Sequence, residues 1–483
     1  MKMHKNLVYL ILITLSFSLS QCTKSEKIPT DIQVHDFVWK GLNAYYLWQS
    51  DIPDIQDNRF NNQTELNNYL FGFESPEVLF ESLLNRPTDR FSIMVDDYIA
   101  LENSLAGISL NNGMEFGLVR YDDGSDNVYG YVRYIIPGSD AETQGVQRGM
   151  LFNTIDNQQL TLGNFGTLLF GSNTTYTVGF ADFNNGNPTS NGNNISLVKG
   201  ELQENPIANS KVIDYNGKKI GYLFYNQFVN TYDSQLNAVF ADFSAQNIDE
   251  LIIDLRYNPG GRVQTATYLG SMITGQFNDQ LFSQEIWNEK VMNRFDPAVF
   301  VNNFTNTINP NSNPEPINSL NLTRVYCIVT GSTASASELL INSLRSYIDV
   351  RLVGTQTVGK QVGSVTLYDS DNLLRNGPNF NTSHTYALQP IVLELSNKDR
   401  ANEPNGFLPG TTLPGIELAE DYSNLGVIGE TSDPLLNRTL IYIDTGSKTA
   451  GPVKNLVVNK PIYDSKLARP LGNNMFVDFK LKQ

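Results

Sequence analysis

Residues 324–354, "RVYCIVTGSTASASELLINSLRSYIDVRLVG", combine four local patterns in one stretch. The runs "RVYCIVTG" and "VRLVG" are largely apolar, which is typical of strands that are buried on both faces of a sheet. Between them, "ASELLINSLRSY" predicts a helix, and this helix follows a loop of small residues. Strand, loop, helix and strand in this order predict one unit of an α/β domain with a partly parallel sheet.

The same alternation continues toward the N-terminus of this stretch. It predicts strands in "KIGYLFYNQF" (219–228) and "DELIIDLRYN" (249–258), and helices in "DSQLNAVFADFSAQ" (233–246) and "VQTATYLGSMITG" (263–275). We therefore expect an α/β core over residues 201–450, interrupted by an Asn- and Pro-rich surface insertion at 302–319. Residues 451–483 are expected to form a C-terminal extension.

Two further domains are expected before this core. Residues 31–100 have apolar and aromatic side chains at spacings of three and four, which predicts a helical N-terminal subdomain. Ser75 followed by Pro76 is a typical helix start. Residues 105–200 change to short alternating strands separated by Gly, Asn and Asp, which predicts a small β domain.

The composition limits the classes of partner. The chain has 483 residues and a formal net charge of −16, from 34 basic and 50 acidic residues. Nucleic-acid binding requires clustered Lys and Arg, so this acidic balance argues against a nucleic-acid partner.

The first residues have the pattern of an export signal. Lys2 and Lys5 precede the apolar run "LVYLILITLSFSL", which is too short to span a bilayer comfortably. The run leads to "LSQC", which resembles a bacterial lipoprotein box, although Gln21 departs from the small residue usual there. We expect a signal peptide at 1–21, lipidation at Cys22 and a tether over 22–30. The protein would then be exported and held on a membrane surface, on the periplasmic or outer side.

A serine in the small-residue loop "TGSTASASE" has the surroundings of a nucleophile. It lies at the positive end of a helix, where free N–H groups stabilise a developing oxyanion. Such a serine needs a base. His384 is the one histidine that could serve, and the alternative is a neutral lysine, for which Lys360 in its apolar surroundings "TVGKQVGSV" is the candidate. Ser337 and Glu338 also have a simpler interpretation as helix-terminus residues.

The stretch "GTQTVGKQ" (354–361) also matches most of a phosphate-binding loop, G-x-x-x-x-G-K-[ST]. That loop requires a helix directly after its lysine and a hydroxyl residue for Mg²⁺. Gln361 replaces the hydroxyl residue, and the following "QVGSVTLYDSDN" is strand-like. We therefore expect no nucleotide partner.

The motifs "DLRYNPGG" (254–261), "TASASE" (333–338) and "VGKQ" (358–361), in this order, resemble those of the C-terminal processing peptidases, or tail-specific proteases. The resemblance implies that Ser335 is the nucleophile, that Lys360, 25 residues further along, is its base, and that Glu338 orients this lysine. It implies an oxyanion hole formed by Ala336 with Gly260 or Gly261, and these two glycines stay open. Asp254 and Arg256 can equally be a structural ion pair. The connection from Gly261 to Ser335 is longer than is usual, and Gln361 stands where a glycine is common.

The stretch "IIPGSDAETQGVQRGMLFNTIDNQQL" (135–160) resembles a PDZ domain of the bacterial protease type, with a short helix from Asp140 to Gln144. Such domains capture an extended C-terminal peptide by strand addition. The resemblance places the carboxylate-binding loop at Gly113, Met114, Glu115, Phe116 and Gly117.

The sequence predicts an α/β multidomain protein with an N-terminal helical subdomain, and the resemblances imply a PDZ-like β domain and a ClpP/crotonase-like α/β catalytic core. The resemblance implies a serine endopeptidase that needs no metal or cofactor and acts on protein substrates recruited by their C-termini. The alternative is a non-catalytic ligand- or peptide-binding protein on the same scaffold.

Overall fold

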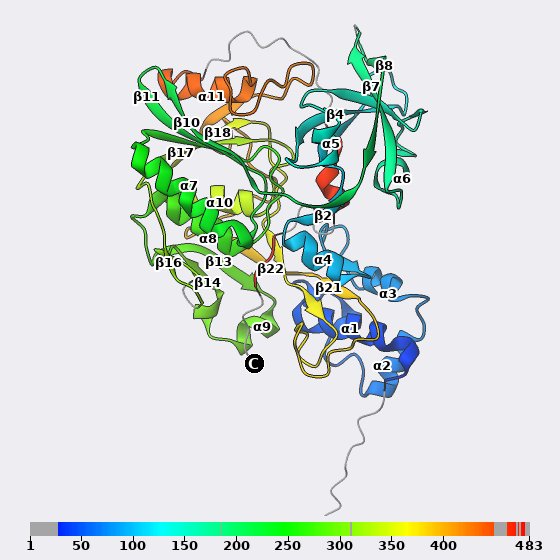
Figure 1. The fold of residues 1–483 in the computed structure, drawn as a ribbon. Coiled ribbons are helices and arrows are strands. Elements are labelled where there is room, and N and C mark those ends of the chain that lie inside the picture. The colour runs from blue at the N-terminus through cyan, green and yellow to red at the C-terminus, as the bar shows by residue number, and fades with distance from the viewer. Residues whose placement is uncertain are drawn as a thin grey trace, which may run out of the picture.

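The computed structural model describes residues 28–184, 186–309, 312–448, 461–469, 472 and 475–478. They form three parts: an N-terminal helical part, a β domain and an α/β core (Figure 1). The predicted signal peptide, Cys22 and most of the tether lie outside the described residues, as does much of 451–483. In the described part of the chain, no helix is both long and apolar enough to cross a membrane.

The core is built on a six-stranded sheet with the order β10-β11-β12-β17-β18-β23. All neighbouring pairs are parallel except β10 and β11, so the predicted, partly parallel sheet is confirmed. The strands are β10 (Ile207–Tyr215), β11 (Lys218–Tyr225), β12 (Glu250–Asp254), β17 (Arg324–Val329), β18 (Asp349–Gly354) and β23 (Gly415–Glu417).

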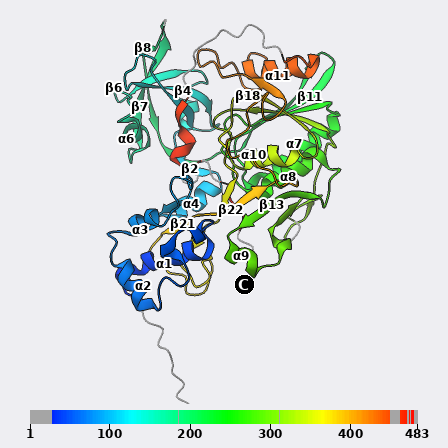
Figure 2. The same cartoon turned by 180° about the vertical axis from the view of Figure 1, so that it is seen from behind.

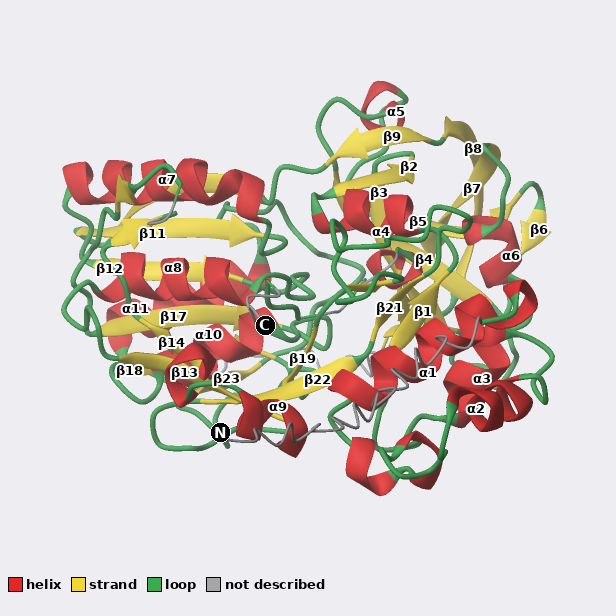
Figure 3. Cartoon of the chain, turned by 90° about the horizontal axis from the view of Figure 1, so that it is seen from below, coloured by secondary structure: helices red, strands yellow, loops and turns green. Residues whose placement is uncertain are grey.

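Helices cover both faces of this sheet, as the continuously apolar strands predict. Helices α7 (Asp233–Gln246), α8 (Val263–Thr274) and α10 (Ala336–Leu344) lie side by side on one face (Figure 3). Helix α11 (Pro434–Thr445) packs on the other face, where Leu436 and Leu440 are fully buried. The sheet therefore holds the loops at the carboxyl ends of its strands in a rigid frame.

A smaller, four-stranded sheet adjoins the face with α10 and has the order β14-β13-β22-β19. It consists of β13 (Leu281–Trp287), β14 (Val301–Asn303), β19 (Val362–Ser364) and β22 (Ile391–Ser396), and α9 (Glu289–Arg294) follows β13. The predicted insertion at 302–319 contains the paired strands β15 (Thr307–Ile308) and β16 (Glu315–Pro316). Asn237 of α7 donates a hydrogen bond to Glu315 at 2.6 Å, so this insertion is fastened to the outside of the core.

The N-terminal part contains α1 (Gln33–Tyr45), α2 (Gln63–Leu70), α3 (Pro76–Ser82) and α4 (Tyr98–Leu105). Ser75 caps α3 by accepting a hydrogen bond from the Val78 amide, as the sequence predicts. Strand β1 (Ile93–Val95) pairs with β21 (Ala387–Gln389), which pairs with β20 (Leu367–Tyr368). These strands join the N-terminal part to the core.

The β domain contains the predicted short helix as α5 (Asp140–Thr143), and α6 (Phe165–Phe170) follows later. Strands β2 (Ile108–Asn111) and β9 (Gly200–Gln203) pair at its junction with the rest of the chain. Its main sheet comprises β3 (Met114–Arg120), β4 (Val128–Ile135), β5 (Leu151–Ile155), β6 (Gln158–Gln159), β7 (Thr175–Phe183), β8 (Pro188–Val198) and β24 (Pro461–Asp464). The last of these strands comes from the C-terminal segment, which the sequence did not indicate.

Candidate active site

Ser335 lies in the loop between β17 and α10, directly before the first residue of the helix. Its φ of 67° is in the left-handed region, which costs a residue with a side chain about 1–3 kcal/mol. The side chain is fully buried, and its Oγ has no hydrogen-bond partner among the residues that the structure describes. A strained serine at a helix N-terminus, whose hydroxyl makes no hydrogen bond within the described residues, is the arrangement expected of a nucleophile.

Glu338 joins the serine loop to the lysine loop. Its Oε2 accepts hydrogen bonds from the backbone amides of Ser335 at 2.9 Å and Lys360 at 2.8 Å. Its Oε1 accepts from the Gly359 amide at 2.7 Å and from the Thr357 hydroxyl at 2.5 Å. Burial raises the pKa of Glu338, and these four hydrogen bonds oppose that rise. One carboxylate oxygen therefore binds the backbone of both candidate catalytic residues.

Lys360 is fully buried at the end of the loop that follows β18. Burial lowers its pKa well below the ordinary value, although the charges of Asp89 and Glu338 act to raise it. The Lys360 Nζ lies 4.3 Å from the centroid of the Phe91 ring. A lysine whose pKa is lowered by desolvation can act as a general base near neutral pH.

Asp89 and Phe91 come from a turn of the N-terminal part, which the sequence did not single out. The Asp89 Oδ1 accepts hydrogen bonds from the amides of Phe91 and Ser92, and its Oδ2 accepts one from the Tyr46 hydroxyl at 2.9 Å. The Ser92 hydroxyl in turn accepts from the Ile391 amide in β22 at 2.8 Å. The turn is thus held rigidly against the lysine, across a large separation in the chain.

A second loop supports the lysine from the other side. The Phe407 amide donates to the Thr357 hydroxyl at 2.8 Å. Gly359 has a φ of +83°, and a Cβ at this position would lie 2.3 Å from the Pro404 carbonyl oxygen. A glycine is therefore required directly before Lys360 for two independent reasons.

The turn that contains Gly260 packs against the serine loop. The Asn258 carbonyl oxygen accepts from the Ala334 amide at 3.1 Å and from the Ser337 hydroxyl at 3.2 Å. The Gly260 amide donates to the Asn258 side chain at 2.9 Å. Ser337 therefore helps to fix the turn, which explains its hydroxyl without a catalytic role.

Two backbone amides of the serine loop and the glycine turn are not engaged by the described part of the chain. The Ala336 and Gly261 amides donate no hydrogen bond to any atom in the described part of the chain, whereas the Gly260 amide is already bound by Asn258. The sequence left Gly260 and Gly261 open as the second oxyanion donor. This difference favours Gly261 as the donor and gives Gly260 a steric role.

Gly260→Ala is expected to lower kcat/KM by at least about 10²-fold, because displacement of the nucleophile by as little as 1 Å has an effect of this size. An added Cβ would lie 2.5 Å from the Ser335 Cβ and 2.8 Å from its Oγ. The control is Gly124→Ala: Gly124 also has a positive φ, of +78°, but an added Cβ has nothing within 4 Å. Steady-state kinetics and thermal unfolding of both variants test this, and equal activity of the two would contradict it.

Two sequence alternatives are resolved by the geometry. His384 is not placed as a base for Ser335, because its Nε2 contacts Asp369 at 3.0 Å and its Nδ1 accepts from the Tyr386 amide. The described residues after Lys360 form strand β19 instead of a helix, so the phosphate-loop interpretation lacks its anion-binding helix terminus.

Asp254 and Arg256 form a buried ion pair, with 2.7 Å between Oδ2 and Nη2. Asp433 of the loop before α11 also contacts the Arg256 guanidinium at 2.8 Å. The structural interpretation of this pair is therefore confirmed.

Gln361 is buried, and neither polar atom of its side chain has a partner among the described residues. Nothing in the structure explains why glutamine stands here.

The predicted peptide-binding loop lies at the start of β3. The amides of Gly113 and Met114 donate to the side chains of Asn111 and Asn112, at 2.7 and 3.1 Å. The Phe116 amide donates to the Ser465 hydroxyl at 3.0 Å. In this structure the loop is thus engaged by residues of the same chain.

Two family models match separate parts of the chain. Residues 219–375 match peptidase family S41, and residues 33–93 match the peptidase S41 N-terminal domain. The second match contains Asp89, whose charge acts to raise the pKa of Lys360, and Phe91, whose ring centroid lies 4.3 Å from the Lys360 Nζ.

Two curated relatives carry related names. A carboxyl-terminal-processing protease of Picosynechococcus is 26% identical over 47% of this chain and 49% of its own length. A CtpA-like serine protease of Staphylococcus epidermidis is 22% identical over 34% of this chain and 30% of its own length. The chain thus spans about half the length of the first relative, and less of the second.

A crystal structure of an S41 protease from Bacteroides fragilis is 24% identical and covers 85% of this chain and 97% of its own, with a TM-score of 0.63. This likeness concerns the mixed α/β multidomain fold. Together the matches support the family that the three motifs predict, the C-terminal processing peptidases.

Proposed function

We propose that the chain is a serine endopeptidase of the C-terminal processing type, with Ser335 as the nucleophile and Lys360 as the general base. The observation that carries the proposal is the Glu338 carboxylate, which accepts hydrogen bonds from the backbone amides of both residues. A carboxylate in this position fixes the two loops relative to each other, while the Ser335 hydroxyl makes no hydrogen bond within the described residues. Such positioning is one of the contributions that a rigid scaffold makes to nucleophilic catalysis.

The proposed reaction follows the usual course of acyl transfer. The Ser335 Oγ attacks the carbonyl carbon of a peptide while the neutral Lys360 Nζ accepts the hydroxyl proton. The Ala336 and Gly261 amides donate hydrogen bonds to the oxyanion. The lysine then gives its proton to the leaving amine, and an acyl-enzyme forms. Water, deprotonated by the same lysine, hydrolyses this ester and restores Ser335.

The direct test is cleavage of a flexible protein substrate by the purified protein and by Ser335→Ala. We expect the wild-type protein to release peptides and the variant to release none above background. A wild-type protein that binds the substrate without cleaving it would instead support the non-catalytic alternative, and equal cleavage by both would exclude Ser335 as nucleophile.

The pH dependence of cleavage tests the role of Lys360. Only the neutral lysine accepts a proton, so kcat/KM should rise with pH through the lysine pKa and then level off. The negative charge of Asp89 raises that pKa. Asp89→Asn should therefore move the rising limb to lower pH, by on the order of one unit.

Asn at position 89 can still accept the hydrogen bonds from Phe91 and Ser92 through its Oδ1. The control is Asp57→Asn, which removes an exposed carboxylate from the same N-terminal part. If the rising limb of the kcat/KM profile stayed in place or moved to higher pH in Asp89→Asn, the Asp89 charge would not raise the pKa of the catalytic base as proposed.

The proposal includes export and a lipid anchor at Cys22, and recruitment of substrates by their C-termini through the PDZ-like domain. Incorporation of a labelled fatty acid into the protein, but not into Cys22→Ser, would support the anchor. Equal labelling of both would overturn it.

A further inference from the structure

The C-terminal segment returns to the rest of the molecule after α11 and first pairs with the β domain. Strand β24 runs antiparallel to β3, with Asp464 opposite Gly117 and Tyr463 opposite Leu118. This is the edge of β3 that carries the predicted peptide-binding loop. The segment is drawn in red beside β4 and β2 in Figures 1 and 2.

Charged side chains fasten this part of the segment. Arg469 forms ion pairs with Glu115 of β3 and with Glu204, the latter at 3.1 Å. Lys466 lies 3.5 Å from Glu204 and donates to the Asn226 carbonyl oxygen at 2.9 Å. The two acidic side chains are buried, so they require these cations as partners.

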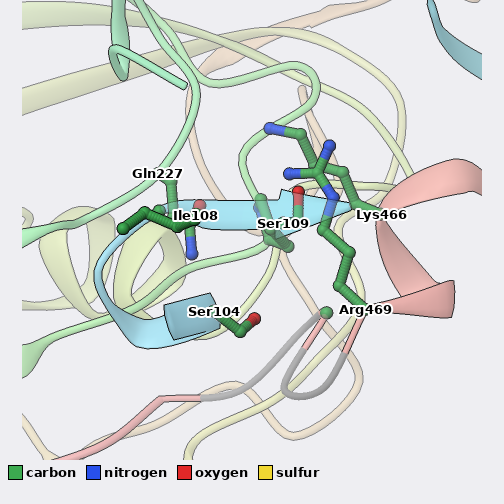
Figure 4. A pocket seen from close by; sticks show the side chains of 9 residues that line it. Ser104, Ile108, Ser109, Gln227, Lys466 and Arg469 are labelled. Carbon is green, nitrogen blue, oxygen red and sulfur yellow. The ribbon is translucent and has the colours of Figure 1, made fainter. Parts of the chain in front are cut away.

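The segment then passes the glycine turn of the candidate active site. Lys466, Arg469 and Gly472 line a small pocket together with Pro259, Ile108 and Ser109. Figure 4 shows the long side chains of Lys466 and Arg469 near Ser109 of β2. The C-terminal segment thus links the β domain to the turn that holds Gly260 and Gly261.

Residues 475–478 pair with the backbone directly after Gly260. The Phe476 amide donates to the Gly261 carbonyl oxygen at 3.2 Å, and the Val263 amide donates to the Phe476 carbonyl oxygen at 3.0 Å. Asp478 forms an ion pair with Arg262, whose Nε lies 3.0 Å from Oδ2. The pairing is that of a parallel β-bridge between Arg262 and Phe476.

The other edge of the same four residues pairs with β19, which follows Lys360. The Ser364 amide and hydroxyl donate to the Met475 carbonyl oxygen at 2.9 and 3.0 Å. The Val477 amide donates to the Ser364 carbonyl oxygen at 3.1 Å. Met475 is fully buried. The segment is therefore an added strand between the turn that contains Gly260 and Gly261 and the strand that follows Lys360.

We propose that the groove between residues 261–263 and β19 is the site where an extended peptide substrate pairs with the core, and that residues 475–478 occupy it as an intramolecular competitor. The inference rests on the proposed function, because it concerns the same site. Main-chain hydrogen bonds on both edges suit an extended peptide of variable sequence.

The attachment of β24 to β3 makes this competition effective. A segment already held on the same molecule has an effective concentration in the millimolar range, so modest intrinsic affinity suffices for high occupancy. Ser335 and Lys360 are both fully buried in this arrangement. A substrate must displace residues 475–478 before its carbonyl can reach Ser335.

Two variants test this competition. A chain that ends at residue 474 removes the competitor, and Asp478→Lys replaces the ion pair with Arg262 by repulsion. Both should raise kcat/KM on a flexible protein substrate, the truncation by about 10-fold. The control is Asp242→Lys, the same change at an exposed position of α7, which should leave kcat/KM unchanged. Unchanged kcat/KM in the truncated chain would overturn the proposal.

A binding measurement separates this inference from the proposed activity. A labelled peptide with the sequence of residues 475–483 is titrated into the truncated chain that also carries Ser335→Ala, and its fluorescence polarisation is followed. We expect saturable binding, weakened in a peptide with Asp478→Lys, whether or not the protein is a peptidase. Absence of binding at millimolar peptide concentration would overturn the proposal that residues 475–478 occupy a peptide-binding groove.

Discussion

Lys360→Met is expected to lower kcat/KM by at least about 10³-fold while the protein remains folded, because activation of the serine is lost but the buried volume is kept. Methionine fills a similar space, and it lacks the amine whose burial lowers the pKa of Lys360. Replacing a desolvated charge by an apolar side chain is often neutral or stabilising. The loss should therefore appear in the kinetics and not in the thermal unfolding.

The double variant with Ser335→Ala makes this prediction sharper. Residues that act as one catalytic unit have strongly non-additive effects, so the double variant should be no less active than Ser335→Ala alone. The measurement is kcat/KM of the wild type, both single variants and the double variant on one substrate. Losses that multiply in the double variant would show that the two residues act independently, against the proposed pair.

Glu338→Ala is expected to reduce the free energy of unfolding by about 3–5 kcal/mol, as well as to abolish cleavage. The four donors that Glu338 binds would lose their acceptor inside the core: the amides of Ser335, Gly359 and Lys360, and the Thr357 hydroxyl. An unsatisfied buried donor costs about 1–3 kcal/mol. Relaxation of the two loops offsets part of the sum.

Glu338→Gln is the matched variant for this prediction. Its amide keeps the shape and one accepting oxygen, but its NH₂ group faces two of the four donors. Urea unfolding should therefore place Glu338→Gln between the wild type and Glu338→Ala. If Glu338→Ala unfolded at the wild-type urea concentration, the carboxylate would not hold the two loops together.

The local patterns of the core were strong enough to predict its elements. The apolar face of "DSQLNAVFADFSAQ" corresponds to α7, and the strand–loop–helix order at 324–344 corresponds to β17 and α10. Small residues and a helix start also indicated where a nucleophile could lie. The resemblance to the C-terminal processing peptidases implied which lysine accompanies it.

Contacts between distant segments could not be predicted in this way. The turn with Asp89 and Phe91 lies against Lys360 because the N-terminal part packs on the core. No local pattern in "RPTDRFS" indicates this contact. Glu338 was expected to orient the lysine, and the structure shows a hydrogen bond from the Lys360 backbone amide to its carboxylate, which the local sequence does not indicate. The path of residues 461–478 likewise depends on strand edges formed elsewhere in the chain.

The PDZ-like interpretation of residues 105–200 stays a prediction. The edge of β3 has the position expected for peptide capture, yet β24 of the same chain occupies it. A partner peptide would have to displace β24 from β3. Peptide capture by the β domain and substrate entry into the groove between residues 261–263 and β19 would then both require release of the C-terminal segment.

The central claim is that Ser335 forms a covalent bond with the substrate acyl group under the control of Lys360. A serine-reactive phosphonate probe, followed by mass spectrometry of the digested protein, tests it most directly. The probe is applied to the full chain and to the chain that ends at residue 474, each with and without Lys360→Met. The account predicts an adduct on Ser335, slowed strongly in both Lys360→Met proteins. An adduct on another serine, or equal labelling without the lysine, would contradict it.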